Sequence, residues 1–229
     1  MLIANPVYDV IFKRLMDNLD IAKGILERIL DTPIAKLDFA SQELSTTKEA
    51  ERLSYYRLDF TAQIETPDGY KLVMIEMQKG RIGSDVERFR GYLAEEYKRK
   101  CEVREEDGEV RQRGLPLITI YFFGLPIDER LPGAFKINRE YIDLITGETL
   151  PWRCDVMERL THDAYVVQIS RLREQQRNEV EELLDIFRQD RIFDPEGHML
   201  NVDTDSRQSE LVQEIIRTLS YLVHHFLKR

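Results

Sequence analysis

Cysteine is scarce in this chain, with only Cys101 and Cys154 among 229 residues. Two cysteines make no disulfide framework, and neither stands at a spacing typical of a metal site. None of the four histidines stands in a CxxC or HExxH pattern. A domain held together by disulfides and a zinc centre are therefore both disfavoured, and we expect the two cysteines to be free thiols.

Long apolar runs are missing as well. The longest, such as residues 117–125, are far shorter than the roughly 20 residues that span a bilayer. The N-terminus has neither the basic start nor the apolar stretch of a signal peptide. With 42% hydrophobic and 33% charged residues, the composition is typical of a soluble globular protein, so we expect a cytoplasmic location and no membrane partner.

Positive charge is outnumbered, because 33 lysines and arginines stand against 42 aspartates and glutamates, a formal net charge of -9. Proteins that bind nucleic acid through most of their surface neutralise phosphates with lysine and arginine. The composition excludes that class of protein. A local basic groove is still compatible with this composition.

Hydrophobic periodicity predicts a mixture of helices and strands. Asn5 followed by Pro6 is typical of a helix start and indicates a first helix over residues 6–16. Further helices are expected near residues 20–30, 83–99, 180–187 and 211–226. Strands are expected as a hairpin over residues 55–80, as a strand buried on both faces over 117–125, and at 135–143 and 164–170. Residues 36–47 look extended, residues 101–114 indicate a solvated loop or a ragged hairpin, and residues 191–207 indicate a polar loop.

The pattern divides the chain into an α/β domain over residues 1–172 and a helical C-terminal segment over residues 173–229. The last helix carries an apolar stripe from Leu211 to Phe226. Three interpretations are open. The helix docks on the domain, it pairs with a partner helix to make a homodimer, or it marks a chain cut short.

The stretch YYRLDFTAQIETPDGYKLVMIEMQKG, residues 55–80, aims carboxylates inward from two facing strands. A two-residue turn at Asp68 and Gly69 would place Asp59 opposite Gln78 and would group Asp59, Glu76 and Gln78 on one face. A three-residue turn would shift the register by one and separate Asp59 from Glu76. The alternation favours the first register, because the apolar side chains then collect on the other face.

Two neighbouring carboxylates repel each other unless a cation or a shared proton relieves them. Mg²⁺ prefers carboxylate, carbonyl and water oxygens, often with only one or two protein carboxylates. Asp59 and Glu76, together with the carbonyl of Met77, would supply such a half-open site. The rival interpretation is an ordinary hairpin whose polar face is open to solvent.

Four features in order resemble a known family: the sequence YDVIFKRLM at residues 8–16, the acidic Asp59, the sequence IEMQKG at residues 75–80, and RFRGYL at residues 88–93. Together they are similar to the PD-(D/E)XK nuclease superfamily, in particular to its transposase or recombination-promoting nuclease branch, over residues 5–125. The resemblance implies a restriction-endonuclease-like fold, with a central mixed sheet flanked by helices. It also implies hydrolysis of DNA with Mg²⁺ or Mn²⁺.

In this resemblance Asp59 and Glu76 match the metal-binding positions, and Gln78 matches the position usually held by a catalytic lysine. Lysine would offer a full charge to the phosphate, whereas glutamine offers an amide dipole. Lys79 is adjacent, but alternation turns it to the opposite face. We therefore expect either slower chemistry or help from another cation.

Further residues are candidates for phosphate binding or for support of the site. Arg88 and Tyr92 lie one turn apart on the helix expected over residues 83–99 and could reach a phosphate. The alternative is a solvated Arg88 paired with Glu95 or another neighbour. Asp9 and Lys13 are either an intrahelical ion pair or, for Asp9, the N-terminal acid of the family. The local basic cluster consists of Lys79, Arg81, Arg88 and Arg90.

Two functions follow as hypotheses. The first is a metal-dependent DNA endonuclease that serves recombination or a mobile element. The second is a nuclease fold with weakened catalysis that binds nucleic acid or a protein partner. The sequence does not distinguish DNA from RNA, and it does not reveal a sequence specificity or a cleavage pattern.

Overall fold

A computed structural model describes residues 1–39, 56–66, 69–80, 86–104, 108–173, 178–204 and 209–226. Within these ranges, residues 56–59, 66, 69–72, 74–80, 155 and 224–226 are described by their backbone alone. The positions of these residues are therefore given by strand register.

The chain is a mixed α/β protein, as the sequence predicts, with six α-helices and three sheets in the described residues. The helices are α1 (Asp9–Met16), α2 (Leu19–Leu30), α3 (Val86–Lys98), α4 (Asp155–Glu158), α5 (Glu179–Leu184) and α6 (Glu210–Phe226). Short 3-10 turns are η2 (Ile169–Arg171), η3 (Asp185–Phe187) and η4 (Gln189–Arg191). The strands are β1 (Leu2–Ala4), β2 (Ile34–Phe39), β3 (Tyr56–Thr66), β4 (Gly69–Gly80), β5 (Cys101–Arg104), β6 (Val110–Arg113), β7 (Leu117–Phe123), β8 (Ala134–Ile137), β9 (His162–Gln168) and β10 (Met199–Asn201).

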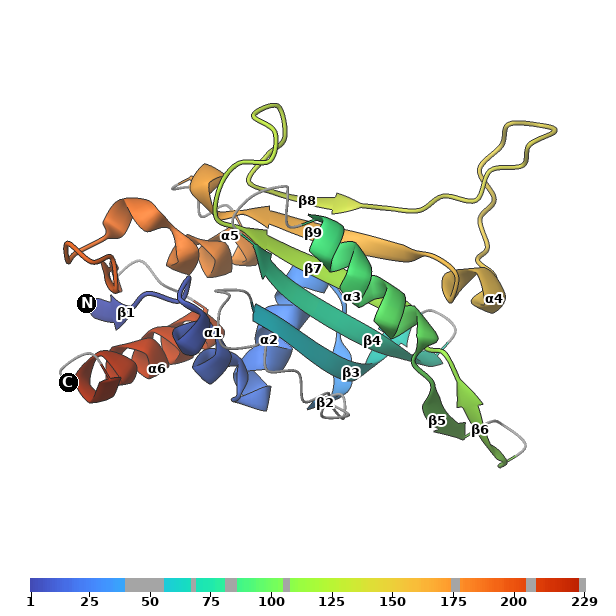
Figure 1. Cartoon of the computed structure of the whole chain (residues 1–229), viewed down its shortest axis with the longest axis horizontal. Coiled ribbons are helices and arrows are strands. Elements are labelled where there is room, and N and C mark those ends of the chain that lie inside the picture. Colours follow the sequence, from blue (N-terminus) through green and yellow to red (C-terminus); the bar gives the residue numbers. More distant parts are fainter. Residues whose placement is uncertain are drawn as a thin grey trace.

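The largest sheet has six strands in the order β2-β3-β4-β7-β9-β8 (Figure 1). Strands β2, β3 and β4 form an antiparallel meander. After β4 the chain passes through α3 and returns as β7, which pairs parallel with β4. Strand β9 is parallel to β7, and β8 is antiparallel to β9 at the edge. The carboxyl ends of β4, β7 and β9 therefore lie at one end of the sheet.

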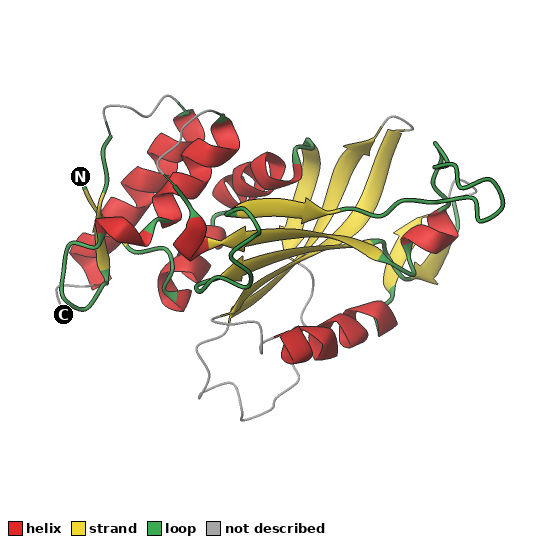
Figure 2. Ribbon diagram, turned by 90° about the horizontal axis from the view of Figure 1, so that it is seen from above, coloured by secondary structure: helices red, strands yellow, loops and turns green. Residues whose placement is uncertain are grey.

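Helices cover both faces of this sheet, but unequally (Figure 2). The main hydrophobic cluster joins α1, α2 and α6 to one face, where Phe60, Phe122 and Val167 are buried. On the other face, α3 lies alone and packs its buried Phe89 against Phe123 and its neighbours in a smaller cluster. The two faces of β3, β4 and β7 thus belong to different environments.

The first helix begins at Asp9, so the prediction of a start at Pro6 capped by Asn5 is wrong. Tyr8 occupies the N-cap position, and its side chain makes no capping hydrogen bond to the helix. Asn5 is instead buried, and its Nδ2 donates to the carbonyl oxygen of Gly197 at 2.7 Å. The distant partner explains the error, because β10 pairs with β1 inside the stretch that looked like a polar loop.

Other boundaries differ in detail from the predictions. Strand β8 is shorter than the predicted residues 135–143, because from Arg139 onward the chain leaves the sheet as a long arm. Arg139 holds the base of this arm through Glu158 at 2.9 Å and Asp163 at 2.8 Å. The charged stretch 101–114 contains the exposed hairpin of β5 and β6, which was one of its two interpretations. Most of the predicted extended segment 36–47 after β2 lies outside the described residues.

The C-terminal helix α6 docks on the rest of the chain. Its stripe residues are buried in the main cluster with α1 and α2; they are Val212, Ile215, Ile216, Leu219, Leu222 and Val223. This stripe is therefore used within the chain. The homodimer stays a prediction, and it would need a different surface from the one that suggested it.

The docked helix gives a stability prediction. Leu219 is 0% exposed, so Leu219→Ala is expected to lower the free energy of unfolding by about 2–5 kcal/mol, because a cavity replaces buried methyl groups. The exposed Glu214 on the same helix is the control, and Glu214→Ala should change it by at most about 0.5 kcal/mol. Urea unfolding measures both. Equal midpoints for the two variants would contradict the docking of α6.

Candidate functional site

The pairing of β3 with β4 sets the geometry of the candidate site. Thr66 is opposite Gly69, and Asp59 is directly opposite Glu76. The predicted register, which placed Asp59 opposite Gln78, is wrong by two residues. The reason is that β4 begins at Gly69, so the connection is residues 67–68 and Gly69 belongs to the strand.

A shift of two residues leaves every side chain on its face, because side chains alternate with a period of two. Asp59, Glu76 and Gln78 therefore occupy positions on one face, which is the grouping expected from the sequence. Directly opposite residues of an antiparallel pair have Cα atoms about 4.5–5.5 Å apart. Two carboxylates at such positions can share one cation.

The neighbouring strands complete this face. Glu76 pairs with Thr119 of β7, and Gln78 pairs with Tyr121. Thr119 is fully buried, and its Oγ1 lies 3.5 Å from the carbonyl oxygen of Asp163. Tyr121 stacks on Phe89 of α3 at 5.3 Å between ring centroids. The candidate face is therefore the one that α3 covers.

One position on this face was missed in the sequence. Arg57 is directly opposite Gln78 in the β3–β4 ladder. The correct register would have identified Arg57 from the sequence, since pairing residue 66 with residue 69 also pairs residue 57 with residue 78. A cationic residue therefore stands opposite Gln78 in the ladder.

The helical spacing of Val86, Phe89, Leu93 and Tyr97 in the sequence predicts one apolar stripe on α3, and the structure shows the helix rotated relative to it. Val86 is 41% exposed and Tyr97 is 38% exposed, whereas Phe89 is buried. Glu96 is also buried and pairs with Arg99 at 3.2 Å. The prediction is therefore wrong at Val86 and Tyr97. The aromatic side chains of β7 pack against Phe89 and its neighbour Tyr92, so these residues face the sheet.

This rotation changes the surroundings of Arg88 and Tyr92. Tyr92 packs against the smaller cluster instead of lying opposite the buried face. The Nε and Nη2 atoms of Arg88 are buried, so this arginine is not fully solvated. Its alternative partner, Glu95, pairs with Lys98 at 3.0 Å. The pairing of Arg88 with a neighbour other than Glu95 stays a prediction. Both Arg88 and Tyr92 thus belong to the helix face directed toward the sheet.

The other supporting residues are not gathered at the same place. Lys79 pairs with Phe122 of the main cluster, so its position is on the opposite face, as alternation predicts. Asp9 begins α1, and Lys13 is exposed on it. Since α1 packs its Phe12 on Phe122 at 5.6 Å between ring centroids, both belong to the layer on the other side of the sheet.

The predicted basic cluster is only partly described. Arg90 is exposed and pairs with Glu87 at 3.1 Å. Arg81 lies outside the described residues. Of the two predicted cations whose side chains are described, Arg88 and Arg90, Arg88 has buried guanidinium atoms.

Another group of potential metal ligands is found among the described side chains. Asp194, Glu196 and His198 have ligand atoms within 4.8 Å of one another. The carboxylate of Asp194, however, accepts hydrogen bonds from the backbone N–H groups of His198 and Met199 at 3.1 and 2.6 Å. These bonds close the exposed loop, so we assign the group a structural role.

The last turn of α3 is anchored to the sheet by a tyrosine–histidine pair. The hydroxyl of Tyr97 lies 2.5 Å from Nδ1 of His162, at the start of β9. Burial lowers the pKa of His162, and the nearby Arg139 guanidinium lowers it further. Both effects disfavour the protonated imidazole in the folded protein.

Comparisons of the chain with models of protein families, with curated proteins and with solved structures found no match. Among the helices of the described residues, none has the length and apolar character needed to cross a membrane. The family resemblance is thus carried by the motif residues and not by overall similarity to a known protein.

The pair at the end of α3 generates a pH prediction. Because the pKa of His162 is lower in the folded protein than its unfolded value of about 6.5, the unfolded chain binds the proton first. Stability should be full above that value and fall as the pH drops below it. Between about pH 7.5 and 5.5, thermal unfolding of His162→Asn should therefore lose less stability than the wild type.

Gln112→Asn, a neutral change at an exposed position of β6, serves as the control and should keep the pH dependence of the wild type. An unchanged pH dependence in His162→Asn would show that this histidine is not held neutral by its environment.

Proposed function

We propose that the chain is a metal-dependent endonuclease that hydrolyses DNA phosphodiesters, of the PD-(D/E)XK transposase-like kind. The observation that carries the proposal is the register of Asp59 directly opposite Glu76, with Gln78 two residues further on the same face. The order of elements also supports it. An antiparallel meander, a crossover helix and a parallel strand fit the restriction-endonuclease-like sheet that the resemblance implies.

The donor set suits Mg²⁺ or Mn²⁺. Asp59 and Glu76 offer carboxylate oxygens from opposite positions, and hard divalent ions prefer such oxygens and complete their shell with water and phosphate. When bound, the ion supplies positive charge that lowers the pKa of the attacking water and polarises the scissile phosphate. No second strong base is then required.

The reaction is a hydrolysis. The oxygen of water forms a bond to phosphorus, its proton passes to solvent, and the bond from phosphorus to the leaving sugar oxygen breaks as that oxygen takes up a proton. Gln78 would hold the water or a phosphate oxygen through its amide. Arg57, opposite Gln78, and Arg88 on α3 are the cations placed to offset the charge that develops on the phosphate.

Cleavage tests the two carboxylates. Asp59→Asn and Glu76→Gln should each reduce Mg²⁺-dependent nicking of plasmid DNA about a hundredfold, since several kcal/mol of transition-state stabilisation depend on the ion. EDTA should abolish nicking by the wild type. Asp17→Asn is the matched control, because Asp17 is an exposed acid that follows α1 on the other side of the sheet and pairs with Arg14 at 3.8 Å. Nicking that survives both site variants would refute the assignment.

A second function is a nuclease fold with weakened catalysis that binds nucleic acid or a protein partner. Gln78 in place of lysine and the net charge of -9 favour it. In this case the acidic pair would bind no ion in the millimolar range, and DNA would be bound without being cleaved.

Gln78 distinguishes the two functions. If the site is an active nuclease limited by the weaker amide dipole, Gln78→Lys should raise the nicking rate about tenfold, and Gln78→Leu should lower it by a similar factor. The initial rate of plasmid nicking at saturating Mg²⁺ measures the change. If both variants and the wild type are equally inactive while DNA binding persists, the binding function is the correct one.

A further inference from the structure

The arm that leaves the sheet after β8 carries a group of exposed apolar side chains. It comprises residues 139–154, and it extends beyond the sheet before the chain enters α4 (Figure 1). On the arm, in α4 and just after it, the exposed large apolar residues are Ile142, Leu144, Ile145, Trp152, Val156, Met157 and Leu160. A group of this size on a soluble protein is typical of an interaction surface.

The tip of the arm is a closed turn that uses its polar groups internally. The carboxylate of Asp143 accepts hydrogen bonds from the backbone N–H groups of Ile145 and Thr146 at 2.7 and 3.3 Å. The N–H of Gly147, at a φ of 75°, donates to the carbonyl oxygen of Asp143 at 2.8 Å. The turn thereby presents Leu144 and Ile145, which are 96% and 93% exposed.

The two sides of the arm are tied to each other and to α4. The N–H of Leu150 donates to the carbonyl oxygen of Tyr141 at 2.7 Å. The Tyr141 hydroxyl in turn donates to Oε1 of Glu158 at 3.0 Å, and Arg139 bonds the other oxygen of this carboxylate. Since these bonds order the arm before any partner arrives, little conformational entropy is lost when its apolar side chains are covered.

Charge is divided along the arm. The tip, residues 140–150, contains three acids and no lysine or arginine, which gives it a formal charge of -3. Around the base, four cations stand against three acids, a formal charge of +1; these residues are Lys136, Arg139, Arg153, Arg159, Asp155, Glu158 and Asp163. The tip and the base therefore have opposite charge, and both carry exposed apolar side chains.

We propose that the arm and α4 bind a second copy of this chain, with the tip of each arm against the base and α4 of the other. Two arms that run antiparallel about a two-fold axis bring the acidic tip of one copy to the basic base of the other, and the reverse. Leu144 and Ile145 of each copy then pack on the apolar side chains of α4. The surface is complementary to itself, and this favours a second copy over an unrelated protein.

The apolar area on this surface suits a stable dimer. The seven exposed apolar side chains, at roughly 100 Å² each, amount to about 700 Å² per copy, and a stable interface takes about 800 Å² from each partner. Trp152, which is 65% exposed, is of a residue type enriched at the centre of interfaces. This dimer uses a different surface from the stripe of α6, and it does not rest on the proposed nuclease function.

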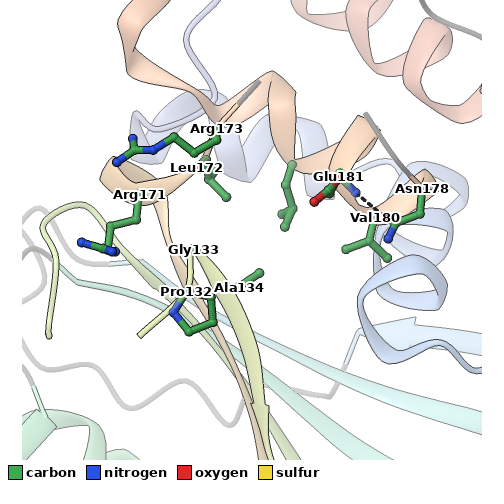
Figure 3. Close-up of a pocket in the computed structure, with 10 residues that line it drawn as sticks. Pro132, Gly133, Ala134, Arg171, Leu172, Arg173, Asn178, Val180 and Glu181 are labelled. Carbon is green, nitrogen blue, oxygen red and sulfur yellow. Dashed lines mark hydrogen bonds between the residues drawn. The ribbon is translucent and has the colours of Figure 1, made fainter. Parts of the chain in front are cut away.

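A cavity of about 530 Å³ lies at the other end of β8 and β9, between the residues that lead into β8 and the start of α5 (Figure 3). Figure 3 shows Arg171 and Arg173 extending away from its apolar lining. The cavity is thus not built to hold an anion, and it lies away from the arm.

The test follows the mass and the fluorescence of the full chain over a dilution series. Sedimentation velocity should show a dimer at high concentration that dissociates on dilution. Trp152 is the single tryptophan of the chain, so its emission reports on the arm alone and should shift to longer wavelength as the dimer dissociates.

The first variant is Leu144→Ser/Ile145→Ser. It should raise the dimer Kd at least about a hundredfold, because four aliphatic side chains per dimer are no longer buried. Both residues are almost fully exposed in the single chain, so its melting temperature measured at a concentration where both proteins are monomeric should equal that of the wild type. Glu148→Arg should raise the Kd about tenfold, since it brings a cation to the basic base of the other copy.

Tyr221→Ser is the matched control, because it removes an exposed large side chain from α6. It should keep the dimer and the Trp152 emission of the wild type. A dimer that is lost with Tyr221→Ser and survives Leu144→Ser/Ile145→Ser would assign the contact to α6 and overturn the proposal. A wild type that stays monomeric at every concentration would overturn it as well, and the arm would then be left for a different protein.

Discussion

The hydrogen-bonded register between β3 and β4 is the constraint on which the candidate site depends. It places Asp59 opposite Glu76 on one face and assigns Phe60 and Val73 to the other, where they enter the main cluster. A slip of one residue would expose this apolar set and bury the polar one, so the core fixes the register. The same burial that stabilises the domain therefore holds the two carboxylate positions together.

The two faces of the sheet carry different tasks as a result. One face is packed by α1, α2 and α6 and provides stability, whereas the other is covered by α3 through a small aromatic cluster. Because a single helix covers this face, the sheet can carry polar residues there beside the aromatic cluster. Arg88 has buried guanidinium atoms on that helix, which is consistent with the proposed site, since that site would have to attract phosphate in an acidic chain.

Local sequence patterns predicted the types of the secondary-structure elements well. They failed where contacts with residues distant in the sequence determine the structure. The alternation of β3 and β4 predicted the polar face, because a period of two survives an error of two residues in the turn. Nothing near Asn5 reveals that its side chain bonds Gly197, almost two hundred residues away, so its reading as a helix cap was wrong. The rotation of α3 depends on Tyr121 and Phe123, which lie on another element. The cavity beside Arg171 is likewise assembled from separate segments and left no motif in the sequence.

The central claim is that Asp59 and Glu76 bind one divalent cation between them. The most direct measurement is a crystal structure of the protein soaked with Mn²⁺, with data collected for anomalous scattering. The account predicts an anomalous peak bonded to a carboxylate oxygen of both residues. The account would be contradicted by a map in which both side chains are well ordered, no such peak is present, and both carboxylates are paired to arginine or lysine instead.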